Sequence, residues 1–115
     1  MMRVLIVEDD PFIALDLADQ LAAAGLSTTG VAATVGQALD LFNRHGCDIA
    51  VLDINLGDET ASPIAQLLTE KEVPFVAVTG YSRDQVPPEF SDATVLTKPV
   101  RVEQLVSEIR ARVGA

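Results

Sequence analysis

Aromatic residues are scarce in this chain: it has no tryptophan, one tyrosine and four phenylalanines among 115 residues. A core of this composition must be aliphatic, and hydrophobic residues, at 49% of the chain, are numerous enough to form one. The chain also has a single cysteine, Cys47, which excludes an internal disulfide and agrees with a reducing compartment. We interpret Cys47 as a small hydrophobic residue buried beside a strand.

Basic residues are also few: 8 Lys and Arg stand against 17 Asp and Glu, which gives a formal charge of −9. This charge disfavours direct contact with the phosphate backbone of nucleic acid and with anionic membrane surfaces. The chain has no apolar run near the roughly 20 residues that a membrane span needs, and no signal-peptide pattern at its start. We therefore expect a cytoplasmic protein that binds neither nucleic acid nor membrane, and whose partner is a cation or a basic protein.

No linker and no internal repeat divides the chain, which predicts one domain over residues 1–115. Short apolar runs alternate with amphipathic stretches. The runs rich in Val, Ile and Thr predict five strands, and the stretches between them predict four helices. The strands are expected at residues 3–7, 27–32, 48–52, 75–78 and 94–96, and the helices at 11–24, 35–44, 62–71 and 102–113.

Apolar strands that alternate with helices indicate a parallel sheet covered on both faces. The predicted fold class is therefore α/β, with a doubly wound five-stranded parallel sheet. Residues 80–93 contain two adjacent prolines and few apolar residues. We expect the fourth crossover to be short or irregular, because proline interrupts a helix.

The first helix begins with Asp10 as N-cap and Pro11 at its first position. Its apolar residues recur at helical spacing and indicate its apolar face: Phe12, Leu15, Ala18, Leu21 and Ala22. Phe12 and Ile13 begin on adjacent faces, so they cannot both be fully buried. We expect Ile13 to be partly exposed at the rim of the functional site. The alternative is that Ile13 packs against the last helix.

Polar residues that could carry chemistry follow four of the predicted strands. In folds of this class the ligand crevice lies beyond the carboxyl ends of the strands. The first strand is followed by Glu8, Asp9 and Asp10, and the third by Asp53 and Asn55. The fourth and fifth strands deliver Thr79 and Lys98. We therefore expect these side chains to meet at one edge of the sheet.

Carboxylates that converge raise one another's pKa unless a cation neutralises them. Mg²⁺ prefers oxygen ligands, typically one or two carboxylates with carbonyl and water oxygens. Asp9 and Asp53 can bind the ion directly, Glu8 can bind it through water, and Asn55 can supply its backbone carbonyl. The alternative is that the acids only cap helices, as we expect for Asp10.

The remaining polar residues complete a minimal site for phosphoryl transfer. Asp53 is the candidate nucleophile, and Lys98 and Thr79 can bind the oxygens of a phosphoryl group. Taken singly, Lys98 could be a solvated side chain and Thr79 a strand-end cap. The single histidine, His45, is not expected to bind a metal, because no second imidazole accompanies it.

The motifs "VLIVEDDP", "IAVLDINL", "VAVTGYS" and "VLTKPV" stand in the order and spacing of a known family. Along essentially its whole length, the chain resembles the receiver domain of two-component response regulators. The resemblance implies a flavodoxin-like sheet of order 2-1-3-4-5 and a cis peptide before Pro99. It also implies that Glu8, Asp9 and Asp53 bind Mg²⁺, that Asp53 accepts a phosphoryl group, and that Thr79 and Lys98 bind the acyl phosphate.

The chain departs from the family pattern in the loop after Asp53 and at the switch aromatic. Gly57 and Ala61 stand where the family commonly has Pro and Gly, so we expect a differently shaped loop. Val95 occupies the usual place of the switch aromatic, and Tyr81 is a candidate substitute for it. "VAVTGYS" resembles a motif of a subgroup of stand-alone regulators, so we expect a single-domain regulator.

The resemblance implies a phosphoprotein of signal transduction rather than an enzyme with a separate substrate. Its phosphodonor would be a sensor histidine kinase or a histidine phosphotransfer protein, docking around the first helix and the loop after Lys98. Slow autodephosphorylation would follow, and output would pass through partner binding or phosphate relay. Two other hypotheses are a docking module that works without phosphorylation and a phosphatase or nucleotidyl enzyme. The enzymatic hypothesis would require a second aspartate where Asn55 stands.

Overall fold

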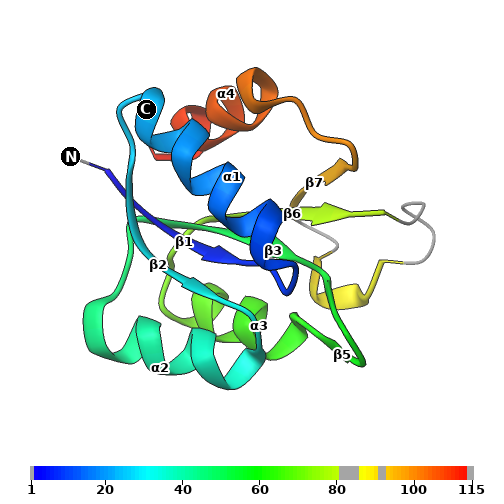
Figure 1. The fold of residues 1–115 in the computed structure, drawn as a ribbon. Helices are drawn as coiled ribbons and strands as arrows, with labels where there is room; N and C mark the ends of the chain where they lie inside the picture. Colours follow the sequence, from blue (N-terminus) through cyan, green and yellow to red (C-terminus); the bar gives the residue numbers. More distant parts are fainter. Residues whose placement is uncertain (1, 81–85, 91–92, 114–115) are drawn as a thin grey trace.

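A parallel sheet of five strands forms the centre of the computed structural model, which describes residues 2–80, 86–90 and 93–113. The strand order is β2-β1-β3-β6-β7, which is the predicted order 2-1-3-4-5 (Figure 1). Each predicted strand is present, and the ends differ from the prediction by at most one residue. The strands are β1 (Arg3–Val7), β2 (Ser27–Ala32), β3 (Ile49–Asp53), β6 (Phe75–Thr79) and β7 (Thr94–Thr97).

Helices cover both faces of this sheet, as predicted. The helices α1 (Pro11–Ala23) and α4 (Val102–Val113) lie on one face, and α2 (Val35–His45) and α3 (Ser62–Glu70) lie on the other (Figure 1). Alternate residues of β1 serve the two faces: Val4 and Ile6 pack in the layer of α1 and α4, whereas Leu5 and Val7 pack in the layer of α2 and α3. The result is a three-layer α/β fold with an aliphatic core.

The connection between β6 and β7 is irregular, as expected. Within its described residues it contains only a short 3-10 helix, η2 (Pro88–Phe90). Phe90 is buried there and packs edge-on against Phe75, with ring centroids 6.0 Å apart. Tyr81, the candidate substitute for the switch aromatic, lies outside the described residues.

The loop after Asp53 has a shape that the sequence did not specify. It forms a small antiparallel hairpin from β4 (Asn55–Leu56) and β5 (Glu59–Thr60). Gly57 begins the two-residue turn with φ of +66°, a conformation that glycine adopts without strain. This hairpin explains why glycine, and not the family's proline, suits position 57.

The prediction of which residues form the buried face of α1 was wrong in part. Its buried residues are Ala14 and Leu21, whereas Phe12 is 82% exposed and Leu15 is 62% exposed. Ile13 is 45% exposed, as predicted. The buried stripe runs through Ala14 and Leu21, so the helix packs on the sheet with a different side from the one that carries Phe12.

The expectation for Cys47 has a structural counterpart. Cys47 is buried beside β3, and its burial, with the nearby charge of Asp48, raises the pKa of the thiol to about 11. The thiol is therefore protonated at neutral pH and poorly nucleophilic. Across the described part of the chain, no helix combines the length and the apolar character that crossing a membrane requires.

Candidate functional site

The site lies at the carboxyl edge of the sheet, where β1 and β3 end side by side. Val7 pairs with Leu52 in the parallel ladder, so the next residues, Glu8 and Asp53, lie side by side where the two strands end. Both side chains are almost fully buried, whereas Asp9 is exposed. The sheet register itself therefore brings together acids that are 45 positions apart in sequence.

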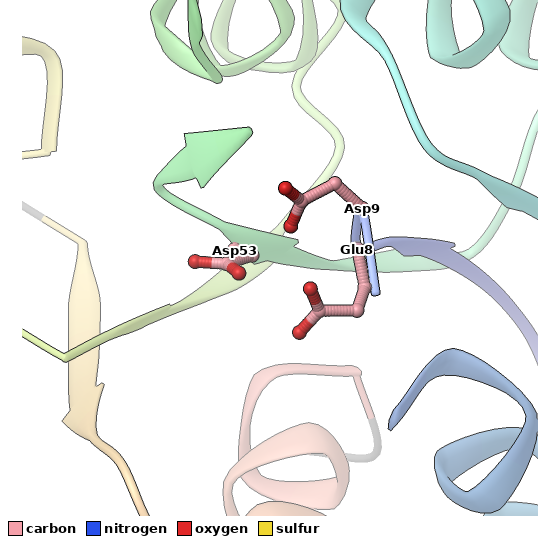
Figure 2. A group of neighbouring side chains, drawn as sticks. All are labelled: Glu8, Asp9 and Asp53. Carbon is pink, nitrogen blue, oxygen red and sulfur yellow. The ribbon is translucent and has the colours of Figure 1, made fainter. Parts of the chain in front are cut away.

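Three carboxylates converge at this edge. Glu8, Asp9 and Asp53 each place one oxygen so that all three oxygens lie within 4.8 Å of one another. Figure 2 shows the three carboxyl groups turned toward a common space beyond the strand ends. Asp10, the third consecutive acid, is not part of this cluster and caps α1. Its side chain accepts hydrogen bonds from the backbone N–H of Phe12 at 2.9 Å and of Ile13 at 3.3 Å.

Lys98 supplies a positive charge to the cluster from the end of β7. Its Nζ donates to Asp53 Oδ2 at 2.9 Å and to Glu8 Oε1 at 3.2 Å. Its backbone N–H donates to the carbonyl of Thr79, and a cis peptide joins Lys98 to Pro99. The ammonium group is thus held between two buried carboxylates.

The pKa values of Glu8 and Lys98 are shifted by burial and by the neighbouring charges of the site. Burial raises the pKa of Glu8 to about 7, with the charge of Asp53 adding to the effect and hydrogen bonds from the Asp10 amide and Lys98 opposing it. For Lys98, burial alone would lower the pKa, but the hydrogen bonds and charges of Asp53 and Glu8 raise it. Lys98 is therefore charged at neutral pH, and Glu8 titrates near neutrality.

Thr79 and Asn55 lie at the same edge. Thr79 ends β6, is 1% exposed and directly follows Val78, the residue paired with Asp53. Asn55 is half-buried, and its backbone N–H donates to Asp53 Oδ1 at 3.3 Å. All five predicted side chains, of Glu8, Asp9, Asp53, Thr79 and Lys98, thus come from adjoining strand ends.

Sequence reasoning missed the approach of Gly57 to the acids. A Cβ at this position would lie 4.0 Å from Asp9 Oδ2, so the hairpin turn faces the carboxylate cluster. The only signal in the sequence was that glycine replaces the family's proline. Gly57 therefore lies beside Asp9, in a backbone conformation with φ of +66° that favours glycine.

A groove leads from the site along α1. Its volume is about 440 Å³, and it runs between α1 and the segment that joins β7 to α4. Glu8, Asp53 and Lys98 line its polar end, and Ile13, Leu17 and Leu105 are among its apolar lining residues. Ile13 is therefore partly exposed in the groove that leads to the site residues, as expected for the rim of the site.

The donor set fits a hard divalent cation. Three carboxylates with converging oxygens, one of them with a pKa raised by burial, gain from a positive charge placed among them. A single lysine does not neutralise three acids. The arrangement can therefore hold a cation and place a carboxylate, that of Asp53, beside both the cation and the Lys98 ammonium group.

Comparison with known proteins identifies the family. A family model for the response regulator receiver domain matches residues 4–110. The chain therefore belongs to this family, whose members are the receiver domains of two-component signalling systems.

Among curated relatives, the transcriptional regulatory protein PdtaR of Mycobacterium tuberculosis is 30% identical over 97% of this chain. The phyllosphere-induced regulator PhyR of Methylorubrum extorquens is 28% identical over 92% of it. The matched regions are 57% of PdtaR and 42% of PhyR, so the chain spans about half the length of these relatives.

Solved structures agree with the fold. SdrG from Sphingomonas melonis is 37% identical, with a TM-score of 0.83 over 100% of this chain and 98% of that one. A CheY-like receiver domain from Methanospirillum hungatei has a TM-score of 0.89 at 24% identity, covering 99% of this chain and 94% of the other. The flavodoxin-like arrangement expected from the resemblance is confirmed.

Proposed function

We propose that residues 1–115 form one receiver domain that accepts a phosphoryl group on Asp53 in a Mg²⁺-dependent reaction. The donor is the phosphohistidine of a sensor histidine kinase or a histidine phosphotransfer protein. The observation that carries this proposal is the placement of the Asp53 carboxylate, which Lys98 contacts at 2.9 Å and which shares a space with the carboxylates of Glu8 and Asp9. Membership of the receiver family supports it.

In the proposed reaction, a carboxylate oxygen of Asp53 forms a bond to phosphorus while the bond from phosphorus to the imidazole nitrogen of the donor breaks. The imidazole nitrogen keeps the electron pair of the broken bond, and the ring leaves as neutral histidine because its other nitrogen carries a proton. Lys98 shifts from the carboxylate to an oxygen of the transferred group, and the Thr79 hydroxyl donates to another. Slow attack by water on the acyl phosphate then releases inorganic phosphate and restores Asp53.

Glu8, Asp9, Asp53 and the backbone carbonyl of Asn55 are the proposed Mg²⁺ ligands, with Glu8 acting through water. When bound, the ion neutralises charge that develops on the phosphoryl oxygens. The protein's own contribution is to hold the acids together through the register of β1 and β3, so that little reorganisation is needed at the moment of transfer.

The groove along α1 is the proposed entry for the donor histidine. Ile13 lines this groove and is 45% exposed, so it can contact a protein donor without being needed for the core. We expect Ile13→Ala to slow transfer from a phosphohistidine protein several-fold while leaving phosphorylation by a small phosphodonor unchanged. Stopped-flow or quench-flow transfer assays measure the first rate. Equal transfer rates for Ile13→Ala and wild type would refute the assignment of Ile13.

The domain does not act as a classical enzyme in this proposal, because the phosphorylated group is its own side chain. We propose output through binding of a partner or relay of the phosphoryl group. We also propose that the domain acts in the cytoplasm. The strongly acidic charge of −9 supports action without direct contact to nucleic acid or an anionic membrane surface. The relative PdtaR is named a transcriptional regulatory protein, so nucleic-acid binding by this chain should be measured directly.

A phosphotransfer assay against candidate histidine kinases tests the function. Kinase carrying labelled phosphohistidine is mixed with the domain in the presence of Mg²⁺ or of a chelator. The proposal predicts rapid movement of label to the domain with Mg²⁺, and loss of that transfer with the chelator or in Lys98→Ala. Transfer at full rate in the chelator would contradict the Mg²⁺ requirement.

A further inference from the structure

The β4–β5 hairpin is tied to the start of α2 by the side chain of Glu59. This residue lies in β5 and is exposed, and its Oε2 accepts a hydrogen bond from the backbone N–H of Val35 at 3.3 Å. Val35 is the first residue of α2, where backbone N–H groups have no partner within the helix. The helix dipole favours a carboxylate at that end. The two residues are 24 positions apart in sequence, so the contact joins separate parts of the fold.

The start of α2 also has local hydrogen bonds that do not involve the hairpin. The Thr34 side chain accepts from the N–H of Gln37 at 3.1 Å, and the Gln37 side chain accepts from the N–H of Ala33 at 2.8 Å. Side-chain acceptors of this kind satisfy a helix start. Because α2 has a cap of its own, the contact from Glu59 constrains the hairpin as well as the helix.

The hairpin positions backbone groups of the phosphoacceptor site. Asn55, whose carbonyl is a proposed Mg²⁺ ligand, pairs with Thr60, the residue after Glu59. The N–H of Asn55 donates to Asp53 Oδ1 at 3.3 Å. Since paired antiparallel strands hold each other through backbone hydrogen bonds, the position of β5 determines the position of the Asn55 backbone.

The two strands of the hairpin are held in different ways. In β4, Leu56 is 3% exposed and packs in the core layer of α2 and α3. Its partner in β5 is Glu59, whose chain neighbours Asp58 and Thr60 are exposed. A two-stranded hairpin is marginally stable by itself. The hydrogen bond to Val35 therefore restricts β5, which burial of Leu56 alone does not hold.

We propose that Glu59 is a positioning residue for the Mg²⁺ site: it anchors β5 to the start of α2 and so holds the Asn55 carbonyl where the ion binds. When only a fraction of the molecules has the binding conformation, the apparent dissociation constant rises by the inverse of that fraction. Loss of the anchor lowers this fraction. The inference rests on the proposed function, because it takes Asn55 as a ligand of the phosphoacceptor site.

Isothermal titration of the unphosphorylated domain with Mg²⁺ tests the role of Glu59. We expect Glu59→Ala to raise the Mg²⁺ dissociation constant about fivefold, a change within reach of one hydrogen bond to a charged group. Glu59→Gln keeps an oxygen acceptor for the Val35 N–H, and Asp58→Asn removes the same charge one residue away. Both should stay within about twofold of wild type. Equal weakening by all three variants would overturn the proposal, because lost charge attraction would then explain it.

Thr34→Ala is the control for helix capping. It removes the local cap of α2 and leaves Glu59 in place, so it should lower the melting temperature in a chelator without changing the Mg²⁺ dissociation constant. The same result for Glu59→Ala would overturn the positioning role. The proposed function would stand in that case, because wild type would still bind the ion. Wild type that binds no Mg²⁺ would contradict both.

The anchor should in turn respond to the ion. Coupling between two sites is reciprocal, so Mg²⁺ should stabilise the Glu59 contact by the factor by which Glu59 favours Mg²⁺. Hydrogen exchange followed by NMR should show that saturating Mg²⁺ slows exchange of the Val35 amide about fivefold. The Gln37 amide, held by Thr34 in the same helical turn, should change less. Equal changes in the two amides, or none in either, would overturn the proposal.

Discussion

The three consecutive acids Glu8, Asp9 and Asp10 have three different environments. Glu8 is buried and contacts Lys98, Asp9 is exposed on the open side of the cluster, and Asp10 caps α1. The repulsion expected between adjacent acids is thus relieved for Asp10 by the helix N-terminus. For Glu8 it is only partly relieved, and its pKa is raised to about 7.

The raised pKa of Glu8 predicts a pH dependence of stability. Between pH 4.5, the ordinary value, and about 7, the folded chain keeps a proton on Glu8 that the unfolded chain loses. The free energy of unfolding should therefore fall as pH rises through this window, by an amount on the order of a few kcal/mol. Urea unfolding in a chelator measures it. Glu8→Gln should show a smaller decline than wild type, and an identical decline would refute the assignment to Glu8.

At the scale of elements, α1 shows what a sequence pattern specifies and what it does not. Its start was predictable because Asp10 and Pro11 determine the cap chemistry locally. Its buried face was not, because Phe12 and Leu15 lie one turn apart and also suit an apolar stripe, whereas tertiary packing buries Ala14 and Leu21. The β4–β5 hairpin was also not predictable, since two-residue strands leave no periodicity to detect.

Removing the cap of α1 should affect stability and not metal binding. Asp10→Ala leaves the N–H groups of Phe12 and Ile13 without their side-chain acceptor, at a cost of about 1 kcal/mol. Chemical denaturation measures the loss, and Asp19→Ala, an exposed site on the same helix, is the control. The Mg²⁺-dependent rise in melting temperature should persist in Asp10→Ala. Its disappearance would mean that Asp10 is a ligand.

At the scale of the whole molecule, the sheet and the site were predictable together. Apolar strands alternating with helices imply a parallel doubly wound sheet, and such a sheet gathers its strand ends at one edge. That is why Glu8, Asp53, Thr79 and Lys98 could be placed at one site before the structure was known. The exposure of Phe12 and Leu15 could not be foreseen, because it depends on how the layers pack.

Binding of Mg²⁺ should stabilise the entire domain, because the three acids converge only when the sheet is folded. An ion that binds the folded state alone adds about 2.7 kcal/mol at a hundred times its dissociation constant. We expect millimolar Mg²⁺ to raise the melting temperature by several degrees in wild type, and much less in Asp9→Asn. Thermal scans with Mg²⁺ or chelator measure this shift. An unchanged melting temperature in wild type would contradict the metal site.

The most direct measurement of the central claim is intact-mass analysis after incubation with a small phosphodonor and Mg²⁺. We predict that wild type gains the mass of one phosphoryl group, that peptide mapping places it on Asp53, and that Asp53→Asn gains none. Wild type without the adduct under these conditions, or an equal adduct on Asp53→Asn, would contradict the account.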